Sequence, residues 1–247
     1  MGIPAHATVA DALLRTHRRN HRAEHLRRIE NLVHAHRGRD PTLADLSLWK
    51  HSADAYQTTF NSKKTWLQFR EAGPEAEWHK GVWFTHSTPK FSFCAWLATH
   101  NRLSTGDRML SWNMGVNTSC VLCHHPLETR SHLFFDCVYS ATIWKALMQG
   151  LLRRKYSTNW QAIVSLISDS SQPLLFLFLA RYAFQATIHS IWKERNSRRH
   201  GEQPLSPNLL ITLIDKLVRN RASSIRMLGD TKYEEVLHTW LEARQNV

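Results

Sequence analysis

The chain has 247 residues, of which 43% are hydrophobic and 21% are charged, and its net charge is +12. The apolar content allows a sizeable core, and only 9 glycines and 8 prolines are present; together these exclude a disordered or fibrous protein. The basic balance favours a polyanionic partner or an anionic surface, although it says nothing about the fold.

The first forty residues contain eight arginines and four acidic residues. Apolar residues at helical spacing predict a basic helix over residues 7–37, with a stripe that Arg and His dilute in the middle. The charged face is either a solvated surface or a nucleic-acid contact. The candidate contacts are Arg15, Arg18, Arg19 and Arg22. Because "RGRDPT" ends this helix, we expect residues 1–41 to form a basic helical arm.

No targeting or membrane segment is predicted. The N-terminus lacks the apolar region of a secretory signal, and its acidic residues and lack of serine disfavour a transit peptide. The most apolar run covers residues 173–180 and ends at Arg181, far short of the roughly 20 residues that span a bilayer. We therefore expect a soluble intracellular protein of the nucleus or cytoplasm, with no membrane partner.

Six tryptophans occur between residues 42 and 112. Tryptophan can stack on nucleic-acid bases, but among Leu and Phe it more often belongs to a core, which is the interpretation we favour here. They are Trp49, Trp66, Trp78, Trp83, Trp96 and Trp112. In the same region, "GVWFTH" indicates a short strand or an extended link, and "PKFSFCAWLATHNRL" has helical spacing.

The most informative stretch is "CVLCHHPLETRSHLFFDC", residues 120–137. A Cys-x-x-Cys-His start is compatible with haem attachment, a redox dithiol or half of a zinc site. Haem attachment would leave His132 and Cys137 without a role, and a redox dithiol would need a preceding buried strand that the sequence does not show. The zinc interpretation uses every one of these residues.

The predicted zinc ligands are Cys120, Cys123, His132 and Cys137. Three thiolates and a neutral imidazole around one Zn²⁺ leave a charge of about −1 and no open position, which is typical of a closed structural site. The alternatives are buried free cysteines and a different fourth ligand, His124 or His125, although both follow Cys123 very closely. The remote Cys94 lies in an apolar helical stretch and is predicted to be a small buried hydrophobe.

Residues 80–145 resemble the zinc-binding domain found C-terminal to the reverse transcriptase of plant non-LTR (LINE-type) retrotransposons. The residues that carry the resemblance before the cysteines are Trp83, Pro89, Lys90, Phe93, Trp96, Leu97, Arg102, Leu103, Thr105, Asp107, Arg108 and Trp112. From the cysteines onward they are Cys120, Cys123, Glu128, Thr129, His132, Leu133, Phe134, Cys137, Ile143 and Trp144. The resemblance implies the same four zinc ligands and a place beside a polymerase, where the domain would help to hold RNA or DNA.

The chain departs from the parent proteins of that family in its acidic residues. It contains no Asp-Asp pair, and its 20 acidic residues are scattered. Two-metal phosphoryl transfer needs several gathered carboxylates, so we predict neither polymerase nor ribonuclease H activity, and no small-molecule substrate. The chain is interpreted as a detached C-terminal piece of a retroelement protein.

The remaining sequence predicts helices. They cover residues 139–152, 159–168, 173–199 and 206–228, followed by a last helix with Thr231 and Glu234 in capping-box spacing. The third is expected to start with a Ser cap in "SSQP" and to end at Gly201, and the fourth to start with Ser206 and Pro207.

The predicted fold is mainly α: a small zinc-stapled helical domain over residues 42–150, followed by a helical C-terminal region over residues 151–247. Further candidate nucleic-acid contacts on the helix at 173–199 are Lys193, Arg195, Arg198 and Arg199. The competing hypothesis is a zinc-stapled protein-interaction module that binds a partner chain and no nucleic acid.

Overall fold

The computed structural model describes residues 4–14, 21–36, 46–71, 73–112 and 115–245. The chain divides into two compact units, residues 1–74 and 75–247. The three-part division expected from the sequence does not coincide with these units, because the zinc-binding stretch and the C-terminal helices share one hydrophobic core.

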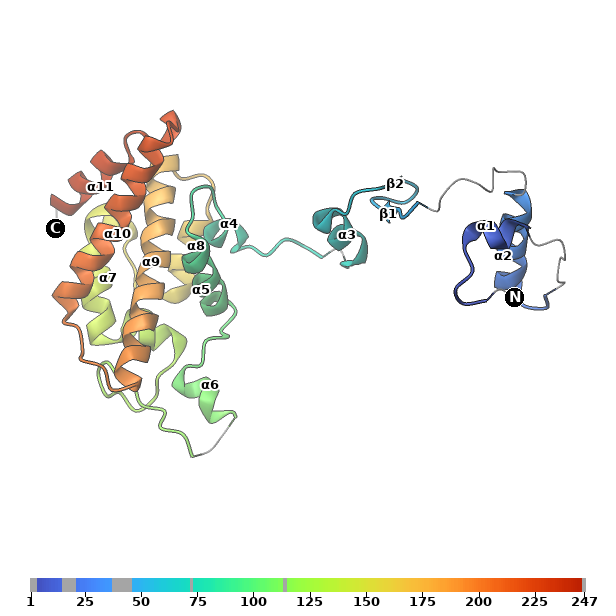
Figure 1. Ribbon diagram of the computed structural model, residues 1–247. Helices are drawn as coiled ribbons and strands as arrows, with labels where there is room; N and C mark the ends of the chain where they lie inside the picture. The colour runs from blue at the N-terminus through green and yellow to red at the C-terminus, as the bar shows by residue number, and fades with distance from the viewer. Residues whose placement is uncertain (1–3, 15–20, 37–45, 72, 113–114, 246–247) are drawn as a thin grey trace. The chain divides into compact units, whose positions relative to one another are not determined.

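The first unit contains short elements (Figure 1). They are α1 (Val9–Leu14), α2 (Glu24–Ala35), β1 (Trp49–Lys50), β2 (Tyr56–Gln57) and α3 (Ser62–Phe69). The two strands pair antiparallel, with Trp49 opposite Gln57. The prediction of one continuous helix over residues 7–37 was wrong, because residues 21–23 are not helical. Residues 21–23, His-Arg-Ala, offer no apolar face whose packing would sustain a helix.

The second unit is helical, which confirms the mainly α prediction. Its first half contains α4 (His79–Val82), α5 (Pro89–Thr99), α6 (Gly106–Leu110), the π-helical turn η1 (His132–Asp136) and α7 (Val138–Leu152). Its second half contains η2 (Arg153–Lys155), α8 (Trp160–Ser168), α9 (Leu174–Arg199), α10 (Pro207–Met227), η3 (Thr231–Tyr233) and α11 (Val236–Gln245). The segment "GVWFTH" is the end of α4 followed by an extended residue, Trp83, and is not a strand.

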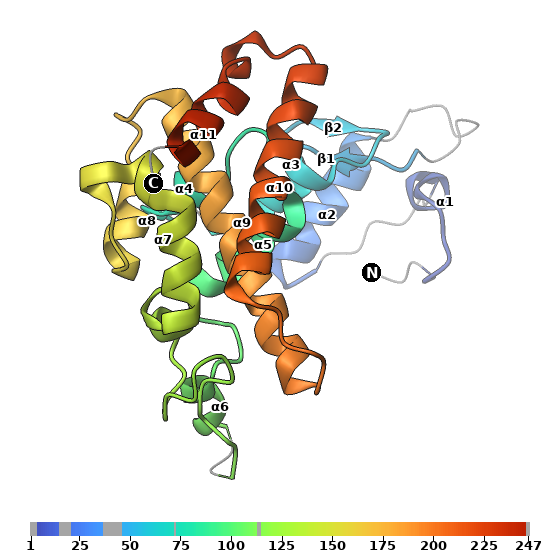
Figure 2. The same ribbon diagram turned by 90° about the vertical axis from the view of Figure 1, so that its left-hand side faces the viewer.

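Helix α9 is the centre of the second unit. It contacts α5, α7, α8, α10 and α11, and Figure 2 shows it surrounded by these helices. Its sequence is apolar on most sides, as expected for a helix buried in a core. By length and composition alone α9 could cross a membrane, but 72% of its apolar window is buried inside the protein. That burial is what a core helix requires.

The helix-start predictions had mixed outcomes. Ser206 caps α10, since its side chain accepts a hydrogen bond from the Leu209 amide, and Pro207 occupies the first turn as predicted. Gly201 follows α9 with a φ of +81°, which a glycine adopts without strain. The other two predictions were wrong: Pro173 precedes α9 with no side-chain cap, and Thr231 and Glu234 lie at η3 rather than at the start of α11.

The tryptophan prediction was also wrong for most of the six residues. Trp49, Trp66, Trp83 and Trp112 are exposed, the last at 62%, and Trp78 and Trp96 are only partly buried. The aromatic core lies later in the chain. Its rings belong to Phe134, Phe135, Trp144, Trp160 and Phe184.

Candidate metal centre

The first two cysteines lie on a tight turn. The Cys120 amide donates to the His125 carbonyl over 2.8 Å, and the His124 amide donates to the Cys120 carbonyl over 2.7 Å. His124 closes the turn with a φ of +64°, a left-handed conformation that is uncommon outside glycine. The turn therefore places the thiols of Cys120 and Cys123 on the same side.

The other two ligands flank a wider helical turn. In an α-helix, side chains five residues apart diverge by about 140°, since each residue turns the chain by about 100°. Here the Cys137 amide donates to the His132 carbonyl over 2.7 Å, an i to i+5 bond that closes a π-turn. This turn returns Cys137 to the side of His132. Leu133 and Phe134, between the candidate ligands, are fully buried in the core.

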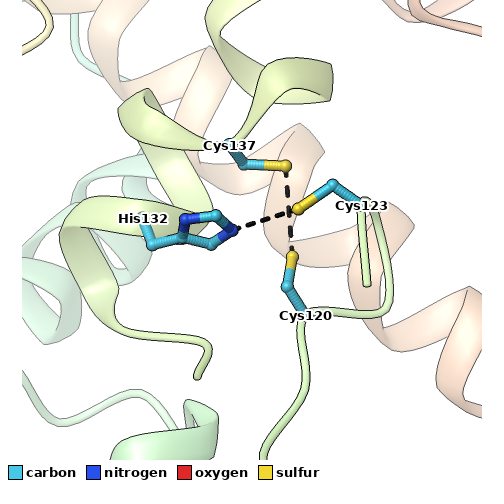
Figure 3. Close-up of side chains that lie close together, drawn as sticks. All are labelled: Cys120, Cys123, His132 and Cys137. Carbon is cyan, nitrogen blue, oxygen red and sulfur yellow. Dashed lines mark hydrogen bonds between the residues drawn. The ribbon is translucent and has the colours of Figure 1, made fainter. Parts of the chain in front are cut away.

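The four side chains converge on one point (Figure 3). All four ligand atoms lie within 4.8 Å of one another. The Cys120 and Cys137 sulfurs are 4.0 Å apart, and the Cys123 sulfur lies 3.2 Å from His132 Nε2. With Zn–S near 2.3 Å and Zn–N near 2.0 Å, ligand atoms of a tetrahedral ion lie about 3.5–3.8 Å apart. The Cys3His set therefore suits zinc in both chemistry and spacing.

Protonation of the cluster also fits a metal centre. The hydrogen bond to Cys137, together with burial, raises the pKa of the Cys120 thiol. The same hydrogen bond lowers the pKa of Cys137. A metal ion bound to both sulfurs would displace their protons, because thiolates are the form that binds metals. Burial, together with the charge of His125, lowers the pKa of His132 and favours the neutral imidazole that binds metals.

The alternative ligands are placed elsewhere. The His125 ring stacks on His132 with ring centres 4.5 Å apart, and both His124 and His125 are exposed. Neither belongs to the cluster of candidate ligands. Cys94 is buried in α5, where burial raises the pKa of its thiol to about 12, so the prediction that it is a small buried hydrophobe is confirmed.

A buried ion pair attaches the cysteine loop to α9. Arg195 Nη2 lies 2.7 Å from Glu128 Oε1, and both side chains are almost completely buried. Arg195 also donates to the Ser104 carbonyl over 2.8 Å. Glu128 is in turn fixed by its backbone, since its amide donates to the Thr118 carbonyl and its carbonyl accepts from the Asp107 amide. Sequence reasoning missed this pair.

Other contacts hold the loop in the same position. Arg199 donates to the Asn117 carbonyl over 3.1 Å. Arg130 lies over the Trp160 ring at 4.3 Å and donates to the last carbonyls of α5, where a cation complements the helix dipole. A Cβ on Gly106 would lie 2.3 Å from the Thr118 carbonyl oxygen, so only glycine fits there.

The predicted nucleic-acid contacts have very different environments. Arg22 and Lys193 are exposed. Arg195 is buried in its ion pair with Glu128, and Arg198 pairs with Glu194 over 2.7 Å. Their guanidinium groups therefore bind carboxylates of the protein itself. Arg199 holds the loop as described. The other three, Arg15, Arg18 and Arg19, lie outside the described residues.

The fold and the cluster define a helical protein with a candidate Cys3His zinc centre. Residues 60–144 match the family described as zinc-binding in reverse transcriptase. This match covers all four candidate ligands and concerns an accessory zinc-binding family, not a catalytic reverse transcriptase or ribonuclease H domain. No curated protein and no solved structure matches the chain.

Proposed function

We propose that the chain is a non-catalytic accessory module of a retroelement reverse transcriptase, of the plant non-LTR type, that binds one structural zinc ion and contributes to holding RNA or DNA. The observation that carries this proposal is the closed cluster of Cys120, Cys123, His132 and Cys137 within the segment that matches the reverse-transcriptase zinc-binding family. Four protein ligands leave no position for a reacting water.

A structural zinc ion agrees with the surroundings of the cluster. Cys120 and Cys137 are fully buried, and the buried Glu128–Arg195 pair fixes the loop between the ligands. The loop itself offers little to a polyanion, since its arginine, Arg130, is bound to α5 and Trp160. Nucleic acid would therefore bind to cations outside the loop.

The proposal is tested on purified full-length chain. Metal analysis should give one zinc per chain, and binding of labelled RNA and DNA should weaken steeply as salt rises, because phosphate contacts release counterions. Primer extension and RNA cleavage should both be absent. Activity that survives repurification and is lost on changing a residue of this chain would refute the non-catalytic assignment.

A second candidate function, a protein-interaction module, is favoured by a separate observation. The stretch from residue 46 to residue 69 exposes several large apolar side chains, including Trp66 at 64% and Phe69 at 82%. Apolar exposure of this kind marks interaction sites. If the chain bound neither RNA nor DNA at low salt, this second function would replace nucleic-acid binding.

A further inference from the structure

Helices α5, α9 and α10 enclose a groove of about 470 Å³ in the second unit. Helix α9 lies between the other two (Figure 1). His189, Lys193 and Ser197, spaced four residues apart, line the groove as one stripe of α9. Lys90 and Phe91 line the side of α5, and Leu213, Lys216 and Leu217 line the side of α10. The groove is distant in sequence from the zinc ligands.

The groove gathers positive charge from three helices. Lys90, Lys193 and Lys216 line it, and none of them forms an ion pair with a carboxylate in the described part of the chain. Two acidic residues also line the groove. Glu194 is neutralised by Arg198 and accepts from the Leu205 amide, which leaves Glu202 as the opposing charge.

The environment of His189 reports the same positive field. Burial lowers the pKa of this imidazole, and the charges of Lys90 and Lys193 lower it further. The charged residues that line the groove together with His189 are Lys90, Lys193, Glu194, Glu202 and Lys216. Among the described residues that line the groove, the three lysines outnumber the one unpaired carboxylate, and the low-dielectric walls of the groove concentrate their electric field. The groove therefore attracts an anion.

Apolar side chains lie beside these cations. The Phe91 ring packs against His189 with ring centres 4.7 Å apart, and Leu213 on the opposite side is 43% exposed. A ligand that contacts both the lysines and the apolar side chains therefore combines an anionic group with a flat apolar surface. A nucleotide has both. The volume lies within the usual range for small-ligand sites, about 300–1,000 Å³.

We propose that this groove is a binding site for single-stranded nucleic acid, with phosphates on Lys90, Lys193 and Lys216 and one base against Leu213. A duplex keeps its bases inside the stack, and extruding one costs a few kcal/mol, so a single strand uses the apolar wall more readily. This inference rests on the nucleic-acid binding proposed above. It adds the surface of the protein that binds, which is this groove, and the kind of nucleic acid that is bound, which is a single strand.

A pair of stacked aromatic rings lies further along α5, outside the groove lining. Phe93 lies one helical turn after Lys90, is 54% exposed, and stacks with Trp96 at a ring-centre distance of 5.6 Å and an interplanar angle of 29°. Arg102 lies over the Trp96 ring at 5.8 Å. An exposed aromatic ring is the usual support for an unpaired base, so a neighbouring base of the bound strand has a place on Phe93, with Trp96 behind it.

The test compares two triple variants of the zinc-loaded full chain. The groove variant is Lys90→Gln, Lys193→Gln and Lys216→Gln. The control variant is Lys145→Gln, Arg226→Gln and Lys232→Gln, which removes the same charge from exposed positions outside the groove. Binding of a labelled 12-nucleotide single strand and of a duplex of equal length is measured by fluorescence anisotropy over a range of salt concentrations.

We expect the groove variant to lower the slope of log K against log salt by about two units on the single strand, since each of three phosphate contacts contributes about 0.7. The control variant should keep the wild-type slope. Equal losses in both variants would show diffuse binding and overturn the groove, while the proposed function would stand. If wild-type protein bound neither probe, nucleic-acid binding itself would fail.

A third variant tests the apolar wall. Leu213→Gln keeps the charge and changes a partly exposed side chain, so it should reduce the preference for the single strand over the duplex and leave the salt slope unchanged. Polyglutamate of matched charge serves as a competitor. If polyglutamate displaced the strand as well as an unlabelled oligonucleotide does, the groove would be a general polyanion site and the nucleotide assignment would be wrong.

Discussion

The loop from residue 117 to residue 137 and the helical core beneath it are stabilised in different ways. The core is built from apolar side chains of α7, α9 and α10 that are almost fully buried, such as Leu147, Phe184 and Ile214. The loop has one short regular element, η1, and brings together four candidate metal ligands and the Glu128–Arg195 pair. A candidate metal site and a buried charge pair thus add to the apolar packing of Leu133, Phe134 and Phe135 where the chain is irregular.

The largest expected effect comes from a ligand. Cys120→Ser should abolish stoichiometric zinc binding and unfold the loop, because apparent free energies of structural zinc binding reach about 10–16 kcal/mol in small zinc domains. Zinc content and thermal unfolding are measured. Cys94→Ala, a change at a buried cysteine outside the cluster, is the matched control and should keep zinc. A Cys120→Ser protein with full zinc content would contradict the ligand assignment.

The next effect comes from the buried pair. Glu128→Gln leaves the Arg195 guanidinium buried without its counter-charge and should cost about 3–5 kcal/mol in denaturant unfolding. Replacing both partners, by Glu128→Gln with Arg195→Met, should restore part of that loss. Strict additivity of the two single changes would show that the pair does not couple the loop to α9.

A substitution in the core should lower the stability of the protein without changing its zinc content. Leu147→Ala removes a side chain that is 1% exposed and should lower the free energy of unfolding by about 2–5 kcal/mol through lost burial and a cavity. Because Leu147 is not a ligand, zinc content should stay at the wild-type value. Loss of zinc in this variant would mean that the loop and the core fold as one inseparable unit.

The smallest expected effect is at a helix cap. Ser206→Ala removes the hydrogen bond to the Leu209 amide at the start of α10 and should cost about 1 kcal/mol. Ser170→Ala, at an exposed serine in the stretch where a cap of α9 was predicted, should be near neutral, because the structure shows no side-chain cap there. Equal costs for both variants would contradict this assignment of the caps.

Local features of the fold could be predicted from the sequence. The spacing within eighteen residues predicted the four side chains that converge as candidate zinc ligands, and Ser206 and Pro207 predicted the start of α10, because each pattern depends on residues close together in the sequence. The π-turn could not be predicted from the sequence, because the same residues could also form an ordinary α-helical turn. Only the structure shows the i to i+5 bond that brings Cys137 to the side of His132.

Contacts between distant segments could not be predicted. Glu128 and Arg195 are 67 residues apart, and Arg195 resembles a surface cation in sequence because its helix end is rich in arginine. The tryptophans before residue 113 were predicted to be core residues because large aromatic side chains are usually buried. Their burial depends on distant segments, however, and rings later in the chain fill the interior instead. The groove lysines likewise come together only through the packing of three helices.

The central claim, that a zinc ion folds the loop on a core that does not need it, is tested most directly by hydrogen exchange of the zinc-loaded chain before and after chelation. We predict that amides of residues 117–131, the part of the loop before η1, lose protection when zinc is removed, while amides of α9 and α10 remain protected. Unchanged protection of the loop after complete removal of zinc would contradict a structural role for the metal.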